Sequence, residues 1–235
     1  MNQEPDIMEM ALELEAKFEA MIAAAPAKPI ASKPATTLHD TVKASSGWGS
    51  RYCIKTELTG EKWLATLEKA KAAVAACGIV VFLGGRGNGK TQMAAEVARA
   101  CQFPNDPGEW NGHRMTFEKT ALYRRAMDLF LDLRDAAKRN SDISEKDVLA
   151  KLERCGLLVI DEFQERGASD WEDRIITSLI DKRYAAQRPT ILIANFTKAE
   201  MGDALSASVK DRIRENGKRF DFDWPSFREF NQTKP

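Results

Sequence analysis

The feature of the sequence that most constrains the fold is the stretch GGRGNGKT, residues 84–91, together with the apolar run before it. The stretch fits the pattern G-x-x-x-x-G-K-[ST], which follows a buried strand and opens a helix. Residues 78–85 (GIVVFLGG) are typical of a buried parallel strand, and residues 90–101 (KTQMAAEVARAC) are typical of a helix. A glycine-rich turn with an accidental lysine is the alternative, and the flanking strand and helix disfavour it. The sequence therefore predicts a phosphate-binding loop.

The chemistry of such a loop assigns a role to its residues. Glycines allow the backbone to curl around a phosphate without Cβ clashes, and several N–H groups then point inward at the positive end of a helix. Lys90 can reach the β- and γ-phosphates of a nucleotide, and the Thr91 hydroxyl can ligate Mg²⁺. The predicted nucleotide-binding residues of the loop are Gly84, Gly85, Arg86, Gly87, Asn88, Gly89, Lys90, Thr91 and Gln92.

Strands and helices alternate along the rest of the chain. Ahead of the loop, an apolar face predicts a helix over residues 60–76. After the loop, the patterns predict strands at 114–119, 156–163 and 189–196, and helices at 121–139, 145–154 and 171–187. This alternation predicts an α/β domain over residues 51–235, in which helices cover both faces of a parallel sheet.

Polar side chains end two of these predicted strands. Asp161 and Glu162 end LLVIDE, and Asn195 lies near the end of ILIANF. Ligands bind at the carboxyl ends of strands in open parallel sheets. We therefore expect Asp161 to hold Mg²⁺ through water, and Glu162 to orient and deprotonate an attacking water. Asn195 can hold that water or sense the γ-phosphate; a cap or turn role is the alternative for all three residues.

The N-terminal part of the chain has a different pattern. Residues 6–24 predict an amphipathic helix, assigned to a segment 1–25, and residues 26–50 have the Ala-, Pro-, Ser- and Thr-rich composition of a flexible linker. A tethered apolar face favours docking to a partner protein, while packing on the chain's own domain remains the alternative. The predicted docking stripe consists of Ile7, Ala11, Leu14, Phe18 and Met21.

The composition excludes several classes of protein. Lys+Arg and Asp+Glu number 35 each in 235 residues, and this neutrality argues against the whole chain acting as a polycation on nucleic acid. No apolar run is long enough to span a membrane, and the N-terminus is polar rather than a signal peptide. The four cysteines are far apart and only two histidines are present, so we expect no zinc site and reduced thiols in a cytoplasmic protein.

Together these motifs make the region from about residue 51 to residue 230 resemble the AAA+ ATPases of the DnaC/IstB type, which comprise bacterial and phage helicase loaders and insertion-sequence transposition ATPases. The segments that carry the resemblance are GNGKTQMA, LLVIDEF, SLIDKRYAAQRPTILIANF, VKDRIREN and WPSFR. The resemblance implies ATP and Mg²⁺ as cofactors and a five-stranded sheet in the order 5-1-4-3-2. It also implies that Asn195 is the first sensor residue and that no separate helical lid domain is present.

The chain departs from the family pattern in two places. Family members carry a folded N-terminal domain, sometimes with zinc, where this chain has one predicted helix and a linker. The family's last motif tends to read Gly-x-Ser-x-Arg, and here it is Trp224-Pro225-Ser226-Phe227-Arg228. The motif keeps its serine and arginine, so Arg228 is carried over as a candidate nucleotide-binding residue. Trp224 and Phe227 are open to two interpretations, base stacking or core packing.

The segment VKDRIREN, residues 209–216, contains two arginines. Ser208 and Asp211 are spaced as an N-cap and its N3 partner, which predicts a short helix that ends near Gly217. Arg212 and Arg214 would then point about 200° apart, so they cannot both face one phosphate.

The family pattern aligns Arg212 with the arginine finger. It implies that Arg212 reaches the γ-phosphate held by Lys90 of an adjacent subunit, and therefore that the chain forms a homo-oligomer. Arg214 would face solvent or DNA. In the same family, the region after the second strand faces the groove where single-stranded DNA runs, which makes Arg124, Arg125 and Lys138 candidate phosphate contacts. A solvated helix face is the alternative for each of them.

Three functions are compatible with these features. The first is an ATPase of the bacterial cytoplasm, bacterial or phage-encoded, that oligomerises with ATP, binds single-stranded DNA and grips a replicative DNA helicase with its N-terminal helix. The alternative is an IstB-like ATPase that oligomerises on duplex DNA and recruits a transposase. A third is an ATP-dependent interaction module without hydrolysis, against which the intact Lys90, Asp161 and Glu162 argue.

Overall fold

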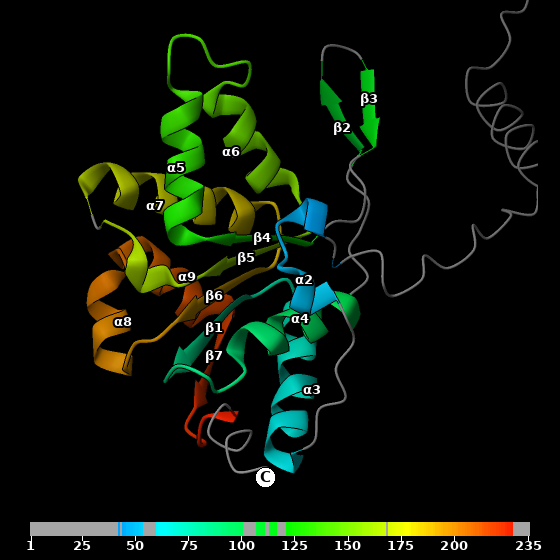
Figure 1. The fold of residues 1–235 in the computed structure, drawn as a ribbon, viewed down its shortest axis with the longest axis vertical. Helices are drawn as coiled ribbons and strands as arrows, with labels where there is room; N and C mark the ends of the chain where they lie inside the picture. The colour runs from blue at the N-terminus through cyan, green and yellow to red at the C-terminus, as the bar shows by residue number, and fades with distance from the viewer. Residues whose placement is uncertain are drawn as a thin grey trace, which may run out of the picture. The chain divides into compact units, whose positions relative to one another are not determined.

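The computed structural model describes residues 42, 44–53, 60–100, 107–110, 113–116, 121–167 and 169–227 (Figure 1). The chain divides into two units, Met1–Thr36 and Thr37–Pro235, and every described residue belongs to the second. The predicted N-terminal helix and most of the predicted linker therefore lie outside the described residues. None of the described helices is long and apolar enough to cross a membrane.

A five-stranded parallel sheet forms the centre of the second unit (Figure 1). Its strands are β1 (Ile79–Gly84), β4 (Ala121–Arg125), β5 (Leu157–Asp161), β6 (Thr190–Ala194) and β7 (Gly217–Phe222). They lie in the order β4-β5-β6-β1-β7, and each neighbouring pair is parallel. Counted along the chain, the order is 2-3-4-1-5, which confirms the predicted order 5-1-4-3-2 read from the opposite edge.

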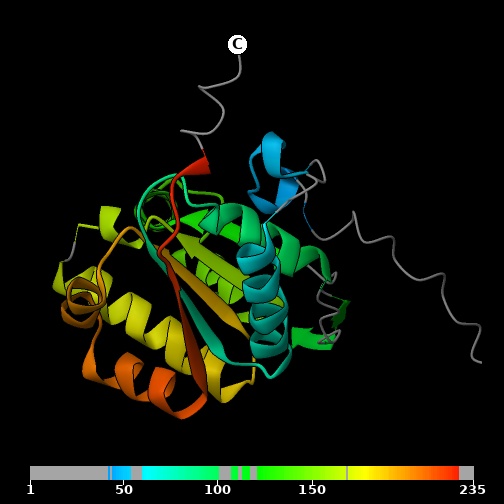
Figure 2. The same cartoon turned by 90° about the horizontal axis from the view of Figure 1, so that it is seen from below.

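Helices cover both faces of the sheet (Figure 2). Each face has its own core, because successive side chains of a strand point to opposite sides. Val80 and Phe82 of β1 enter one core cluster, and Val81 and Leu83 enter the other. The helices of the first cluster are α3 (Glu61–Ala75) and α4 (Lys90–Ala100). Those of the second are α5 (Ala126–Ala136), α6 (Glu145–Arg154), α7 (Asp170–Ala185), α8 (Lys198–Ala204) and α9 (Ala207–Asn216).

The second strand of the sheet differs from its prediction. Residues 113–116 form β3, which pairs with β2 (Pro107–Trp110) in a separate antiparallel hairpin. The strand beside β5 is instead β4, over residues that were predicted as the first turn of a helix. Ala121 and Leu122 are buried in opposite core clusters, and the pairing of β4 with β5 decides the conformation over a local helical pattern.

The end of the predicted linker also differs. Residues 44–53, which we call the strap, contain a 3₁₀ turn (Ala44–Ser46) and the short helix α2 (Ser50–Cys53). Trp48 is only 2% exposed and belongs to the first core cluster. Its indole Nε1 donates a hydrogen bond of 2.9 Å to the carbonyl oxygen of Ala121. Residues before 51 therefore pack as part of the domain, because a buried tryptophan attaches the strap to β4.

Candidate nucleotide-binding site

The predicted phosphate-binding loop leaves the carboxyl end of β1 and leads directly into α4. Gly84 and Gly89 adopt φ values of +139° and +80°, which side chains other than glycine rarely adopt. A Cβ on Gly84 would also lie 2.4 Å from the carbonyl oxygen of Phe222. The strand-loop-helix arrangement expected from the sequence is thus present, and two of its glycines are required by the backbone.

The side chain of Lys90 lies back across the start of the loop. Its Nζ donates hydrogen bonds to the carbonyl oxygens of Gly84 (2.8 Å) and Gly85 (2.6 Å), and the residue is 6% exposed. Burial lowers the pKa of Lys90 to about 8, and the charge of Asp161 opposes that shift. A buried cation is therefore held where the loop begins.

Two oxygen-bearing side chains meet between the loop and β5. Thr91 Oγ1 donates a hydrogen bond of 2.6 Å to Asp161 Oδ2, and Asp161 is 5% exposed. Among the described residues, no three His, Cys, Asp or Glu side chains gather as a metal-binding cluster. One carboxylate and one hydroxyl suit Mg²⁺, which keeps several waters and binds protein through few ligands beside substrate phosphates. The predicted pair Thr91 and Asp161 therefore fits this ion.

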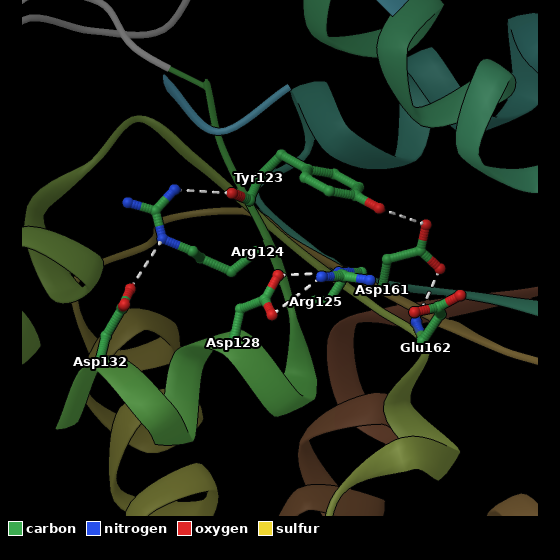
Figure 3. Close-up of polar contacts among 7 residues, drawn as sticks. All are labelled: Tyr123, Arg124, Arg125, Asp128, Asp132, Asp161 and Glu162. Atoms are coloured by element: carbon green, nitrogen blue, oxygen red, sulfur yellow. Dashed lines mark hydrogen bonds and ion pairs between the residues drawn. The ribbon is translucent and has the colours of Figure 1, made fainter. Parts of the chain in front are cut away.

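Tyr123 joins the same carboxylate and was not predicted as a site residue. Its hydroxyl donates a hydrogen bond of 2.9 Å to Asp161 Oδ2 (Figure 3). The residue was assigned to a helix in the prediction. Because it lies instead on β4, beside β5, its side chain reaches the acidic end of that strand. A predicted strand over residues 121–125 would have identified Tyr123, because it would have placed this residue beside β5.

Glu162 and Asn195 end adjacent strands, as predicted. Glu162 adopts φ +52°, an uncommon left-handed conformation for a residue with a side chain, and its N–H donates to Asp161 Oδ1 at 2.7 Å. The N–H of Asn195 donates a hydrogen bond of 3.0 Å to Oε1 of Gln164. Gln164, like Tyr123, was not predicted as a site residue. Asn195 lines a cleft of about 400 Å³ together with Gly84 and Gly85. The ends of β1, β5 and β6 thus lie together around the loop.

Other residues of the predicted loop contact protein groups. Asn88 Nδ2 donates to the carbonyl oxygens of Phe222 (3.0 Å) and Trp224 (2.5 Å), and Trp224 Nε1 donates back to the carbonyl oxygen of Asn88 at 3.0 Å. Asn88 therefore ties the loop to the segment after β7. Arg86 forms a surface ion pair of 3.3 Å with Glu165.

The segment after β7 packs beside the loop. The N–H of Phe227 donates to the carbonyl oxygen of Gly87 at 3.1 Å, and both Trp224 and Phe227 pack against the first core cluster. Of the two interpretations of these aromatic residues, base stacking or core packing, core packing therefore describes their position. In the same part of the site, Gln92 Nε2 donates to Glu96 at 3.0 Å. Arg228 lies outside the described residues.

The two arginines of α9 have separate surroundings. Arg212 Nε lies 3.6 Å from Asp181 Oδ1 of α7, and its guanidinium lies 4.9 Å from the centre of the Tyr184 ring. Arg214 pairs at 2.7 Å with Asp211 of its own helix. The two side chains therefore have different partners, one on α7 and one on α9.

The N-cap predicted for this helix was wrong. Ser206 caps α9 by accepting a hydrogen bond from the N–H of Val209, and the helix begins at Ala207. Ser208 instead donates from its hydroxyl to the carboxylate of Asp181, at 3.0 and 3.1 Å to its two oxygens. A cap two residues earlier leaves Ser208 inside the first turn, where it contacts α7.

The three candidate DNA contacts each pair with an aspartate of the same region. Arg125 makes two hydrogen bonds to Asp128, at 2.8 and 3.0 Å, and Arg124 Nε lies 3.5 Å from Asp132 (Figure 3). Lys138 Nζ lies 2.6 Å from Asp135. These aspartates reduce the positive potential that a phosphate backbone would meet there.

Comparisons with known proteins find relatives in sequence and in fold. No protein-family model matches the chain. Over 149 residues, 63% of its length, the chain is 31% identical to the replicative helicase loader DnaC of Escherichia coli strain K12. It spans about half (55%) of the length of that curated relative.

Solved structures share the fold at lower identity. The crystal structure of the DnaC helicase loader has a TM-score of 0.54 at 18% identity, over 74% of this chain and 99% of that one. AMPPCP-bound DnaA from Aquifex aeolicus has a TM-score of 0.52 at 16% identity, over 70% of this chain and 48% of that one. The sequence similarity thus extends to DnaC, and the similarity of fold extends to both.

Proposed function

We propose that this chain, a DnaC/IstB-type AAA+ protein by its homology to DnaC and by its fold, is an ATP-dependent loader of a replicative DNA helicase. The observation that carries the proposal is the hydrogen bond from Thr91 to Asp161, because it joins the phosphate-binding loop to the acidic end of β5. The homology of this chain to a replicative helicase loader supports helicase loading as the process in which the ATPase acts.

The residues at the sheet edge divide the work of ATP hydrolysis among them. Lys90 offsets the charge of the β- and γ-phosphates, and Thr91 and Asp161 hold Mg²⁺. Bound Mg²⁺ supplies electrostatic stabilisation of the charge that develops on the phosphates. Glu162 orients the attacking water and takes its proton, and Asn195 holds that water from the neighbouring strand.

Assembly completes the site. Arg212 reaches the γ-phosphate of an adjacent subunit, so ATP binding and oligomerisation depend on each other. In support of this role, the Arg212 side chain is 37% exposed while it contacts Asp181 and Tyr184 of α7. The assembled subunits bind single-stranded DNA through sequence-independent phosphate contacts, and the N-terminal helix binds the helicase.

Affinity capture from the native host tests this function. The bait is the Glu162→Gln variant with ATP and Mg²⁺, because removal of the base keeps ATP-bound complexes from turning over. Recovery of a replicative helicase is expected. Recovery of a transposase instead would contradict the proposal and favour the IstB-like alternative. Lys90→Ala protein is the matched control. If this variant captured the helicase equally well, the capture would not depend on ATP.

A further inference from the structure

The carboxylate of Asp161 accepts hydrogen bonds from three different parts of the chain. Thr91 donates to Oδ2 at 2.6 Å. Tyr123 also donates to Oδ2, at 2.9 Å, and the N–H of Glu162 donates to Oδ1 at 2.7 Å (Figure 3). Hydrogen bonds to a charged acceptor are stronger than neutral ones and orient it. The orientation of Asp161 therefore depends on Tyr123, which lies outside both the loop and β5.

The Tyr123 hydroxyl is fitted to act as a donor and not as a base. Its O–H group lies 2.9 Å from Asp161 Oδ2, and a carboxylate oxygen can only accept a hydrogen bond. Its role towards Asp161 is positional.

The ring of Tyr123 is held in turn by the strap. The Trp48 and Tyr123 rings lie 4.9 Å apart at an interplanar angle of 33°, and Trp48 is also attached to β4 by its hydrogen bond to Ala121. Aromatic pairs of this kind stabilise beyond their buried area. A side chain of the strap therefore lies one contact away from the residue that orients Asp161.

The strap follows β4 too closely to move without disturbing Tyr123. Gly47 has φ +89°, and a Cβ there would lie 2.2 Å from the carbonyl oxygen of Tyr123. Arg124 Nη1 donates to that same oxygen at 2.8 Å and to the carbonyl oxygen of Ser46 at 3.5 Å. On its other side, a guanidinium N–H of Arg99 from α4 donates to the carbonyl oxygen of Tyr52. Both ends of the strap are thereby attached to the core.

We propose that Tyr123 is a positioning residue for the magnesium ligand Asp161, and that the strap controls Tyr123 through Trp48. This inference rests on the proposed ATP site. The strap includes the end of the predicted linker, so a pull on the N-terminal part of the chain acts on residues that lie against Tyr123. Displacement of the strap would loosen Tyr123, and Asp161 would then hold Mg²⁺ less well.

Nucleotide affinity measured with and without the metal tests the first half of this proposal. A fluorescent ATP analogue is titrated into the full chain in Mg²⁺ and in EDTA. Tyr123→Phe keeps the ring and removes the hydroxyl. The gain in affinity caused by Mg²⁺ should therefore be smaller by roughly tenfold, as expected for the loss of one hydrogen bond to a charged group. The affinity in EDTA should be unchanged. A Tyr123→Phe protein that responds to Mg²⁺ as the wild type does would overturn the positioning role.

Strap variants test the second half. Trp48→Leu removes the ring contact, and Gly47→Ala displaces the strap without removing any side chain. Each should reduce the Mg²⁺-dependent gain in affinity about threefold or more, and neither should add to the loss caused by Tyr123→Phe, since coupled sites are non-additive. Additive losses, or a wild-type response in both strap variants, would overturn control by the strap.

Trp171→Leu is the matched control, because Trp171 packs on Phe130 in the second core cluster. It should lower the melting temperature and leave the Mg²⁺ response unchanged. If it lowered the Mg²⁺ response as Trp48→Leu does, general loss of stability would explain the effect and overturn the inference. A wild-type protein that gains no affinity from Mg²⁺ would overturn the proposed ATP site as well. A normal gain in the wild type together with an unaltered Tyr123→Phe variant would overturn this inference alone.

Discussion

The phosphate-binding loop and the outer face of α9 hold their charged side chains in opposite ways. Lys90 and Asp161 are about 95% buried and their partners come from the loop itself or from other elements of the sheet edge. The Arg212 side chain is 37% exposed, and its carboxylate partner, Asp181, is 36% exposed. The first region is assembled within one chain. The second leaves part of a cation exposed to solvent.

The largest expected effect is in the first region. Glu162→Gln keeps the shape of the side chain and removes the base, so kcat for ATP hydrolysis should fall by about a thousandfold while ATP affinity is retained. Turnover and nucleotide binding are measured on the same preparation. Glu165→Gln, three residues later in a surface ion pair with Arg86, is the control and should change kcat by less than about twofold. Equal losses in the two variants would remove the distinction between them.

Arg212→Ala tests whether the second region acts on a neighbouring chain. The variant should lose about a hundredfold or more of its ATPase activity, as expected for a finger that stabilises transferring phosphate. Mixing it with Lys90→Ala protein should restore part of that activity, because one variant contributes the finger and the other contributes the intact site. Arg214→Ala, which breaks only a pair within α9, should remain near wild type.

A mixture that co-assembles without recovering activity would contradict this arrangement. It would place Arg212 in the site of its own chain or remove it from catalysis. Under either outcome, α9 would not act on a neighbouring chain, and the contrast between the phosphate-binding loop and α9 would no longer hold.

The pH dependence of nucleotide binding should report on Lys90. Its pKa in the folded protein, about 8, lies below the ordinary value of 10.5, so Lys90 loses its charge as pH rises through 8. Phosphates favour the charged form, and affinity should therefore be nearly flat below about pH 7 and fall about tenfold between pH 7 and 9. Lys90→Arg stays charged throughout and should show a flat profile. A wild-type profile that matches it would contradict the assigned pKa shift.

The smallest expected effect is on the exposed pair that holds Arg212. Asp181→Asn removes the charge from a pair that is 3.6 Å apart and partly solvated, so ATPase activity should fall only about twofold. Asp211→Asn, which releases Arg214, is its counterpart and should have no measurable effect. A loss as large as that of Arg212→Ala would show that the outer face is held as tightly as the loop.

Several parts of this site could be predicted from the sequence because the relevant patterns are local. The glycines and Lys90 follow directly on an apolar run, and Asp161 and Glu162 end another, so a sheet edge with these residues follows from strand geometry. Tyr123 could not be found in this way. Residues 121–139 carry a helical pattern throughout, and only pairing with β5 makes residues 121–125 a strand.

The N-terminal boundary and the cap of α9 show the same limit. Residues 44–50 have the composition of a linker, yet one tryptophan among them is buried against β4. Ser206 and Ser208 are both acceptable N-caps by composition, and contact of Ser208 with Asp181 on α7 accompanies the choice of the earlier one. In each case the deciding partner is far away in the sequence.

The sequence by itself determined the strand-loop-helix unit around Lys90 and the acidic end of β5, since motif spacing and apolar periodicity are written in consecutive residues. The order of the sheet followed from the resemblance to a known family that these motifs carry. Only the tertiary structure decided that Asn88 binds the segment after β7, that Arg212 leans on α7, and that Trp48, Tyr123 and Asp161 form a chain of contacts. The Arg212–Asp181 contact joins residues 31 positions apart, and the Asn88–Trp224 contact joins residues 136 positions apart. Their formation depends on packing and strand pairing, which no local pattern encodes.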